Sequence, residues 1–218
     1  MQTKDLDKVI KILRKEVKKY TIPIVTLIAQ NEGNPFQVLI STILSLRTED
    51  ETTAEAAKRI FKLSKDPLTM SKLSTKQIEK TIYPVGFYIT KAKRIKEICK
   101  ILLDKYNGKV PNDMEKLLEL PGVGRKTANL VLTEGFNTEG LCVDTHVHRI
   151  SNRFGLIKTK NPEETEFALR KILPKKYWIE YNMLLVTYGQ NVCRPISPWC
   201  SKCPISKYCK RIDVNTHR

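Results

Sequence analysis

The chain has 218 residues, and its 39 Lys and Arg against 23 Asp and Glu give a formal net charge of +16 at pH 7. It is long enough for one large or two small domains, and so basic a protein usually meets a polyanion, with nucleic acid favoured over an anionic membrane. It has no run of about 18 apolar residues, and its charged N-terminus excludes a signal peptide, so we expect an intracellular protein of the cytoplasm or nucleoid. The alternative for the charge is a solvated, lysine-rich surface without a polyanionic partner.

Helical spacing of apolar residues begins at the N-terminus and predicts an amphipathic helix from Lys4 to Tyr20. Asn34 followed by Pro35 predicts the start of the next helix. After a break over residues 47–53, a further helix is predicted around residues 57–61, where Ala57, Ile60 and Phe61 recur at helical spacing.

Capping-box spacing over residues 74–77 predicts another helix start. Residues 84–89 are predicted to be a loop. Apolar residues from Ala92 to Tyr106 then predict a helix that Gly108 stops. The same capping-box spacing recurs at residues 112–115 and predicts the opening of one more helix.

Strand-like alternation is nearly absent from the second half of the chain, as it is from the first. A helical face follows Asp144, a helix is predicted from Asn161 through Ile172, and a last long helix from Tyr177 is predicted to end at Gly189. We therefore predict an all-α fold.

The segment Leu120–Ala128, with the sequence LPGVGRKTA, has two glycines one residue apart between two helical patterns. Such glycines permit a tight turn, so the segment predicts a helix-hairpin-helix. The exposed backbone amides of the turn are expected to bind a phosphate at the positive end of the second helix. They belong to Val123, Gly124 and Arg125, and Gly122 is part of the same turn.

Lys126 falls in the first turn of the helix that follows the hairpin. The helix dipole opposes a cation there, so the amine is expected to lose its proton more readily than a surface lysine, as suits a nucleophile. The alternative is a phosphate-binding lysine on a non-catalytic hairpin. The motif alone favours neither.

Four of the six cysteines cluster near the C-terminus, with six, two and five residues between successive members. They are Cys193, Cys200, Cys203 and Cys209. Four thiolates without a histidine suit either an iron–sulfur cluster or structural zinc. Cys99 and Cys142 stand apart from them and are predicted to be buried thiols.

The hairpin, Lys126, the run from Val143 to His146 and the cysteine spacing together resemble the endonuclease III family of DNA glycosylases, over about residues 35–209. This resemblance implies a two-domain helix-hairpin-helix DNA glycosylase fold with a C-terminal iron–sulfur cluster loop. It implies a six-helix domain over residues 23–138, and a second domain from residues 1–22 and 139–218. DNA is expected to bind between the domains.

The resemblance also implies the chemistry. A base cannot be reached inside a duplex, so the nucleotide is flipped out, and Lys126 is expected to attack its C1′ atom and form an imine. Elimination of the 3′ phosphate then follows. Asp144 is expected to accept the lysine proton and to stabilise positive charge on the sugar. Its structural alternative is to cap a helix.

The cysteine spacing matches the [4Fe-4S] loop of the family in all three intervals, which favours that cluster over zinc. Basic side chains around the ligands, Arg194 and Lys202 among them, are expected to grip phosphates. His146 matches a family histidine that could line the DNA-binding site, and a structural histidine is an equal alternative.

Two loops are expected to contact bases. Arg47 matches the family position whose side chain fills the space left by the flipped nucleotide. The family typically has glutamine at this position, and an arginine there favours guanine as the partner base. Phe87 matches the residue that wedges between bases. The alternative for Phe87 is a partly exposed loop packed on the core.

The resemblance thus implies a monomeric, bifunctional DNA glycosylase and apurinic/apyrimidinic lyase that acts on double-stranded DNA and removes oxidised pyrimidines. One alternative is a uracil or thymine mismatch glycosylase, which Arg47 slightly favours. An alternative of another class is a non-catalytic DNA-binding iron–sulfur module, in which Lys126 contacts phosphate.

Overall fold

The computed structural model describes residues 3–32 and 34–218, which form helices joined by turns and loops and include no strand. The predicted all-α fold is therefore confirmed. The chain divides into two compact units, one formed by Met1–Pro23 with Leu141–Arg218 and the other by Ile24–Gly140. Of the helices in the described ranges, none has the length and apolar character needed to cross a membrane.

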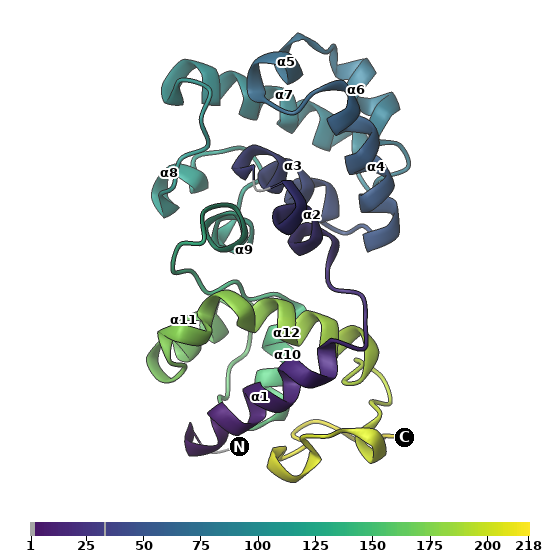
Figure 1. The fold of residues 1–218 in the computed structure, drawn as a ribbon, viewed down its shortest axis with the longest axis vertical. Helices are drawn as coiled ribbons and strands as arrows, with labels where there is room; N and C mark the ends of the chain where they lie inside the picture. The colour runs from purple at the N-terminus through teal and green to yellow at the C-terminus, as the bar shows by residue number, and fades with distance from the viewer. Residues whose placement is uncertain (1–2, 33) are drawn as a thin grey trace. The chain divides into compact units, whose positions relative to one another are not determined.

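The unit formed by residues 24–140 is built around the 19-residue helix α7. Helices α5 and α6 pack along α7, and α3 packs against α2 and α4 (Figure 1). The apolar faces of α3, α4 and α7 supply much of its core. Its elements are α2 (Ile24–Glu32), α3 (Pro35–Ser45), α4 (Asp50–Leu63), α5 (Pro67–Lys72), α6 (Thr75–Ile82), α7 (Tyr88–Tyr106), α8 (Met114–Leu118), α9 (Arg125–Leu130) and the π-helix η2 (Val131–Gly135).

Side-chain caps fix several helix starts in this unit. The Asn34 side chain accepts from the backbone N–H of Phe36, and Ser74 and Gln77 form both hydrogen bonds of a capping box, so these predictions are confirmed. The box predicted at residues 112–115 is wrong by one residue. Asp113 caps α8 instead, by accepting from the N–H of Lys116.

Two helices of this unit, α2 and α5, were not predicted from the sequence, and two loops were predicted too long. The break predicted over residues 47–53 ends at Glu49, because α4 begins at Asp50. The loop predicted over residues 84–89 ends at Phe87, because α7 begins at Tyr88. Phe87 has a φ of 59°, so the chain turns sharply there before the helix starts.

The other unit joins the N-terminal helix to the last third of the chain. Helix α12 is its central element, with α1 and α10 packed against it (Figure 1), and Tyr181, Leu185 and Tyr188 are fully buried. The prediction that this helix ends at Gly189 is wrong, since it continues to Asn191. Its elements are the 3-10 helix η1 (Thr3–Asp5), α1 (Leu6–Val17), α10 (Thr145–Arg153), α11 (Pro162–Ile172), η3 (Lys175–Tyr177), α12 (Trp178–Asn191), η4 (Cys200–Lys202) and η5 (Ser206–Tyr208).

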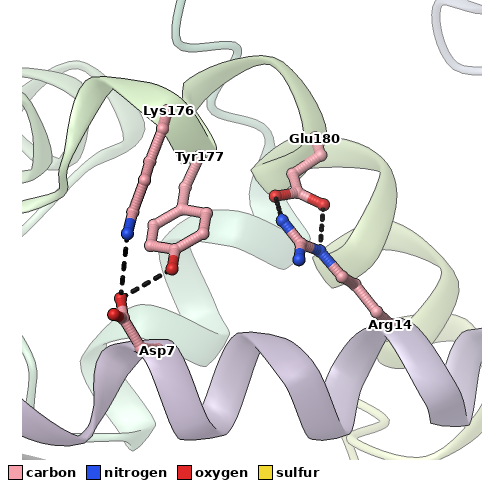
Figure 2. A network of polar contacts seen from close by, with 5 residues as sticks. All are labelled: Asp7, Arg14, Lys176, Tyr177 and Glu180. Atoms are coloured by element: carbon pink, nitrogen blue, oxygen red, sulfur yellow. Dashed lines mark hydrogen bonds and ion pairs between the residues drawn. The ribbon is translucent and has the colours of Figure 1, made fainter.

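Polar contacts join α1 to Tyr177 of η3 and to Glu180 in the first turn of α12, more than 160 residues away in the sequence (Figure 2). Arg14 donates two hydrogen bonds to the Glu180 carboxylate, at 2.8 and 2.6 Å, and the Tyr177 hydroxyl donates to Asp7 at 2.6 Å. These groups lie near solvent, where such pairs contribute at most about 1 kcal/mol. The buried apolar face of α1 therefore carries most of its attachment, and the polar contacts fix its register.

Candidate functional site

The predicted helix-hairpin-helix is present as α8, a turn over residues 119–124, and α9. Gly122 has a φ of 80°, and a Cβ there would lie 2.7 Å from Cδ of Arg94, so the turn requires glycine. Gly124 is exposed, and a Cβ on it would meet nothing within 4 Å. The backbone of the turn at Gly124 is thus open to a ligand.

One predicted phosphate contact at this turn is wrong. The N–H of Val123 donates to the carbonyl oxygen of Leu120 at 3.0 Å, and the Val123 side chain is buried. A tight turn closes by such internal hydrogen bonds, so this amide is used within the hairpin. Gly124 and Arg125 remain the predicted donors.

Lys126 is the second residue of α9, as the sequence predicted. Residues 127–130, which follow it, are buried and anchor the helix in its unit, while Lys126 itself is only partly buried. The Asn129 side chain also donates to the carbonyl oxygen of Arg125 at 3.1 Å. The base of the Lys126 side chain is therefore held on a fixed backbone.

Asp144 is the N-cap of α10, and its Oδ1 atom accepts from the N–H of Val147 at 2.8 Å. The capping alternative is thus confirmed. A cap satisfies an otherwise unpaired amide and fixes the carboxylate in one orientation, so it is compatible with a chemical role. Asp144 and Lys126 belong to different units.

His146 takes part in the packing of its own unit. Arg149 Nη2 donates to His146 Nδ1 at 3.1 Å, because a guanidinium can only donate. A Cβ on Gly189 would lie 2.4 Å from the same ring nitrogen, so the imidazole rests directly on the backbone of α12. These contacts fit the structural alternative; its DNA-binding role stays a prediction.

The four clustered cysteines line one cavity, together with apolar side chains that include Phe154, Val192 and Trp199. None of the six cysteines, all of which lie in the described residues, forms a disulfide. Cys99 and Cys142 are buried elsewhere, as predicted, and burial raises the pKa of the Cys99 thiol to about 12.

Hydrogen-bond donors surround the sulfur atoms of this cavity. The Tyr188 hydroxyl lies 2.8 Å from Cys203 Sγ, and Arg153 Nη1 donates to Cys193 Sγ at 3.6 Å. The N–H of Arg211 donates to Cys209 Sγ at 3.4 Å. Such donors stabilise negative charge on sulfur, as a thiolate ligand requires.

Two observations bear on whether these thiols could bind a metal: the arrangement of possible ligands and the pKa of the thiols. In residues 3–32 and 34–218, no group of three or more His, Cys, Asp or Glu side chains is arranged to hold a metal ion as it stands. Burial raises the pKa of Cys203 and of Cys209, so forming thiolates there costs free energy, which a bound cation would offset.

Basic side chains extend from the loop that carries these cysteines. Lys202 and Arg194 are exposed, as a phosphate contact requires. Lys202 Nζ lies 5.1 Å from the centre of the Trp199 ring, and the Arg218 guanidinium lies 5.0 Å from the same ring. Trp199 thus gathers two cations at the loop surface.

Arg47 and Phe87, predicted to contact bases from separate loops, are brought together by the structure. The guanidinium of Arg47 lies 5.7 Å from the centre of the Phe87 ring, and Phe87 is 62% exposed. Both residues have a left-handed backbone, with φ of 53° and 59°. Non-glycine residues in that region cost roughly 1–3 kcal/mol each, and such strain concentrates at functional sites.

Three residues that brace this pair were missed from the sequence: Thr48, Gly86 and Lys91. Lys91 is 3% exposed, and burial lowers the pKa of its amine to about 8. A signal was available, because Lys91 lies on the apolar face of α7, four residues before Ile95 and seven before Ile98. A lysine at such a position must find partners.

The sequence of this chain is similar to a family of DNA repair proteins and to individual members of it. Residues 40–175 match the model of the HhH-GPD superfamily base excision DNA repair protein. Endonuclease III of Thermotoga maritima is 49% identical over 179 residues, which cover 82% of this chain and 84% of that protein. The chloroplastic endonuclease III homolog 2 of Arabidopsis thaliana is 45% identical over 80% of this chain, which spans only 47% of that longer protein.

Solved structures agree with the sequence comparison. A non-covalent endonuclease III–DNA complex is 32% identical, with a TM-score of 0.85 over 97% of this chain and 96% of that one. A trapped endonuclease III–DNA covalent intermediate is 31% identical, with a TM-score of 0.83 over 97% of both chains. A thermostable thymine-DNA glycosylase, at 24% identity and a TM-score of 0.74 over 93% of this chain and 97% of that one, shares the fold.

Proposed function

Because this chain belongs to the endonuclease III family, within the HhH-GPD superfamily of base excision DNA repair proteins, we propose that it is a DNA glycosylase and apurinic/apyrimidinic lyase for oxidised pyrimidines. The observation that carries the proposal is Lys126, at the start of the helix that follows the hairpin, in a chain 49% identical to an endonuclease III. The partner is double-stranded DNA that holds a damaged base or an abasic site, bound by a monomer.

The proposed reaction uses Lys126 as the nucleophile. Its neutral amine forms a bond to C1′ of a flipped nucleotide, and the bond from C1′ to the base breaks, so the base leaves with the electron pair and takes up a proton. The C1′–O4′ bond of the sugar ring then breaks, O4′ leaves with the electron pair and takes up a proton, and the nitrogen forms a double bond to C1′. The resulting imine acidifies the C2′ hydrogen. Loss of that proton expels the 3′ phosphate and cuts the strand, and water then releases the lysine.

We propose that Asp144 assists these steps by taking the proton of the lysine ammonium and by stabilising positive charge on the sugar. Its support is the resemblance to the family, together with the cap that holds the carboxylate in one orientation. The hairpin at Gly122, Gly124 and Arg125 and the basic side chains of the cysteine loop are proposed to bind DNA phosphates. His146 is proposed to face the same DNA.

The four clustered cysteines are proposed to hold a [4Fe-4S] cluster. They supply four sulfur donors and no histidine, they line one cavity, and donors reach three of their sulfur atoms. When bound, the cluster would fix the shape of the basic loop.

Metal analysis tests this cofactor. Protein purified without oxygen is expected to contain about four iron atoms and four acid-labile sulfides per chain, with a broad brown absorption band. Cys203→Ser should lower both contents and leave the helical circular dichroism of the chain in place. One zinc ion per chain without sulfide would contradict the proposal.

Arg47 supports a second candidate, a mismatch glycosylase that acts on uracil or thymine opposite guanine. Its guanidinium is exposed and presents several N–H donors, which match the two acceptors of guanine. The two candidates share the Lys126 chemistry and differ only in the base that is removed.

A panel of duplexes separates these functions. The protein is incubated with duplexes that carry thymine glycol, uracil opposite guanine, an abasic site or no damage, and borohydride is added to each. We expect covalent adducts with thymine glycol and the abasic site, and none with undamaged DNA. Adducts with the abasic site and the mismatch alone would favour the second candidate. No adduct with any duplex would indicate a non-catalytic DNA-binding module.

A further inference from the structure

Lys91 lies inside the unit formed by residues 24–140, where its amine is the junction of a hydrogen-bond network. Nζ donates to the carbonyl oxygens of Leu44 and Leu46, at 2.7 and 2.6 Å, and to Thr48 Oγ1 at 3.1 Å. All three acceptors belong to the segment that ends α3 and leads into α4, more than 40 residues earlier in the chain. The ammonium uses all three of its N–H donors on this segment.

Thr48 links Lys91 to the second loop, the one that contains Gly86 and Phe87. Its hydroxyl accepts from the N–H of Gly86 at 3.2 Å, in addition to the hydrogen bond from Lys91, and it donates to the carbonyl oxygen of Leu46 at 3.3 Å. A Cβ on Gly86 would lie 2.6 Å from the carbonyl oxygen of Arg47, so the backbones of the two loops are in direct contact.

The network ends at the two exposed side chains of these loops. Arg47 lies between Leu46 and Thr48, and Phe87 follows Gly86, so the backbone groups held at Leu46 and Gly86 are adjacent to these two residues. The third, the carbonyl of Leu44, belongs to the last turn of α3, just before the loop of Arg47. The left-handed conformation at both residues persists only where surrounding contacts impose it. A buried cation with three acceptors is such a contact.

We infer that Lys91 is a positioning residue, which through Thr48 locks the loops of Arg47 and Phe87 into one preassembled element that enters damaged DNA as a unit. The inference rests on the proposed function, because that function gives the element its DNA substrate. Preassembly lowers the entropy lost on binding, so the lock should favour DNA with a vacated base position over intact DNA. Phosphate contacts made elsewhere should not depend on it.

Lys91→Met tests this inference, because methionine keeps the apolar length of the side chain and removes its donors. We expect affinity for a duplex with a tetrahydrofuran abasic analogue to fall about tenfold or more, and affinity for the undamaged duplex to change less than about twofold. At saturating enzyme, the single-turnover rate of strand cleavage at a true abasic site should stay within a few-fold of wild type.

Lys96→Met is the matched control. Lys96 is on the same helix, and its amine also donates to two backbone carbonyls, those of Ser71 and, at 2.7 Å, of Leu73. These carbonyls belong to the C-terminal end of α5 and to the residue that follows it, not to either loop. Lys96→Met should lower thermal stability as Lys91→Met does, yet keep the wild-type preference for the abasic duplex.

Thr48 provides a second route if Lys91→Met does not fold. Thr48→Val keeps the shape of the side chain and removes the bridging hydroxyl, so it should reduce the preference for the abasic duplex, and Thr48→Ser should restore it. In a double-mutant cycle, Lys91→Met should add little to the loss caused by Arg47→Ala, since both disturb one element.

Failure of the positioning role of Lys91 and failure of the proposed function give different results. If wild type prefers the abasic duplex and both Lys91→Met and Thr48→Val keep that preference, the positioning role is overturned while the proposed function stands. If wild type binds both duplexes equally and gives no borohydride adduct, the proposed function fails and the inference fails with it.

Discussion

Replacing Lys126 by alanine is expected to abolish borohydride trapping and to lower the rate of strand cleavage at an abasic site by at least about 10³-fold. Loss of a nucleophile removes the covalent route entirely, and losses of this order or larger are usual. The fold should persist, because alanine is the best helix former and Lys126 is only partly buried at the start of α9. Single-turnover cleavage and gel-resolved trapping measure both effects.

Binding is the control for Lys126→Ala. The affinity of Lys126→Ala for undamaged duplex should fall by less than about tenfold, because the variant loses only one positive charge near the DNA phosphates. A non-catalytic hairpin gives the opposite pattern, with weaker binding as the main effect and no trapping in wild type. Trapping of Lys126→Ala at the wild-type yield would assign the nucleophile to another residue.

Asp144→Asn is expected to have the second largest effect, a loss of about 10²–10³-fold in the single-turnover rate of base release. Asparagine caps a helix as well as aspartate does, so the hydrogen bond to the N–H of Val147 should remain and stability should change little. Only the negative charge is removed. The measurement is release of thymine glycol from duplex DNA at saturating enzyme.

Asp144→Ala separates the two roles of this carboxylate. It removes the cap as well as the charge, so it should also destabilise the chain by about 1 kcal/mol in urea unfolding. If Asp144→Asn releases base at the wild-type rate and only Asp144→Ala is impaired, Asp144 is a helix cap with no part in the chemistry.

Local signals predicted much of the helical framework. The capping residues Asn34 and Ser74 and the glycine turn before Lys126 are decided by neighbouring residues, so sequence spacing is enough to find them. Helix α5 has only six residues, and α2 opens with the β-branched residues Ile24, Val25 and Thr26. In segments as short as α5, or as rich in β-branched residues as the start of α2, the apolar residues show no clear helical spacing. Their conformation is decided by packing against the rest of the unit.

The arrangement of the candidate site could be predicted only in part. Resemblance to a family predicted single residues, whereas the contact between Arg47 and Phe87 depends on a lysine whose acceptors lie more than 40 residues away. In the sequence Lys91 is one of 39 basic residues. The sequence predicted the position of the turn correctly, and on that basis the amide of Val123 was expected to face a phosphate. The amide instead donates a hydrogen bond within the turn, and that bond depends on the backbone geometry of the turn, which the sequence does not show.

The most direct test of Lys126 as the nucleophile is to locate the covalent bond itself. Wild-type protein is trapped with borohydride on a duplex that holds one abasic site, digested, and sequenced by mass spectrometry. We expect a deoxyribose remnant on Lys126 and on no other residue. A remnant on a different lysine, or at the N-terminal amine, would contradict it.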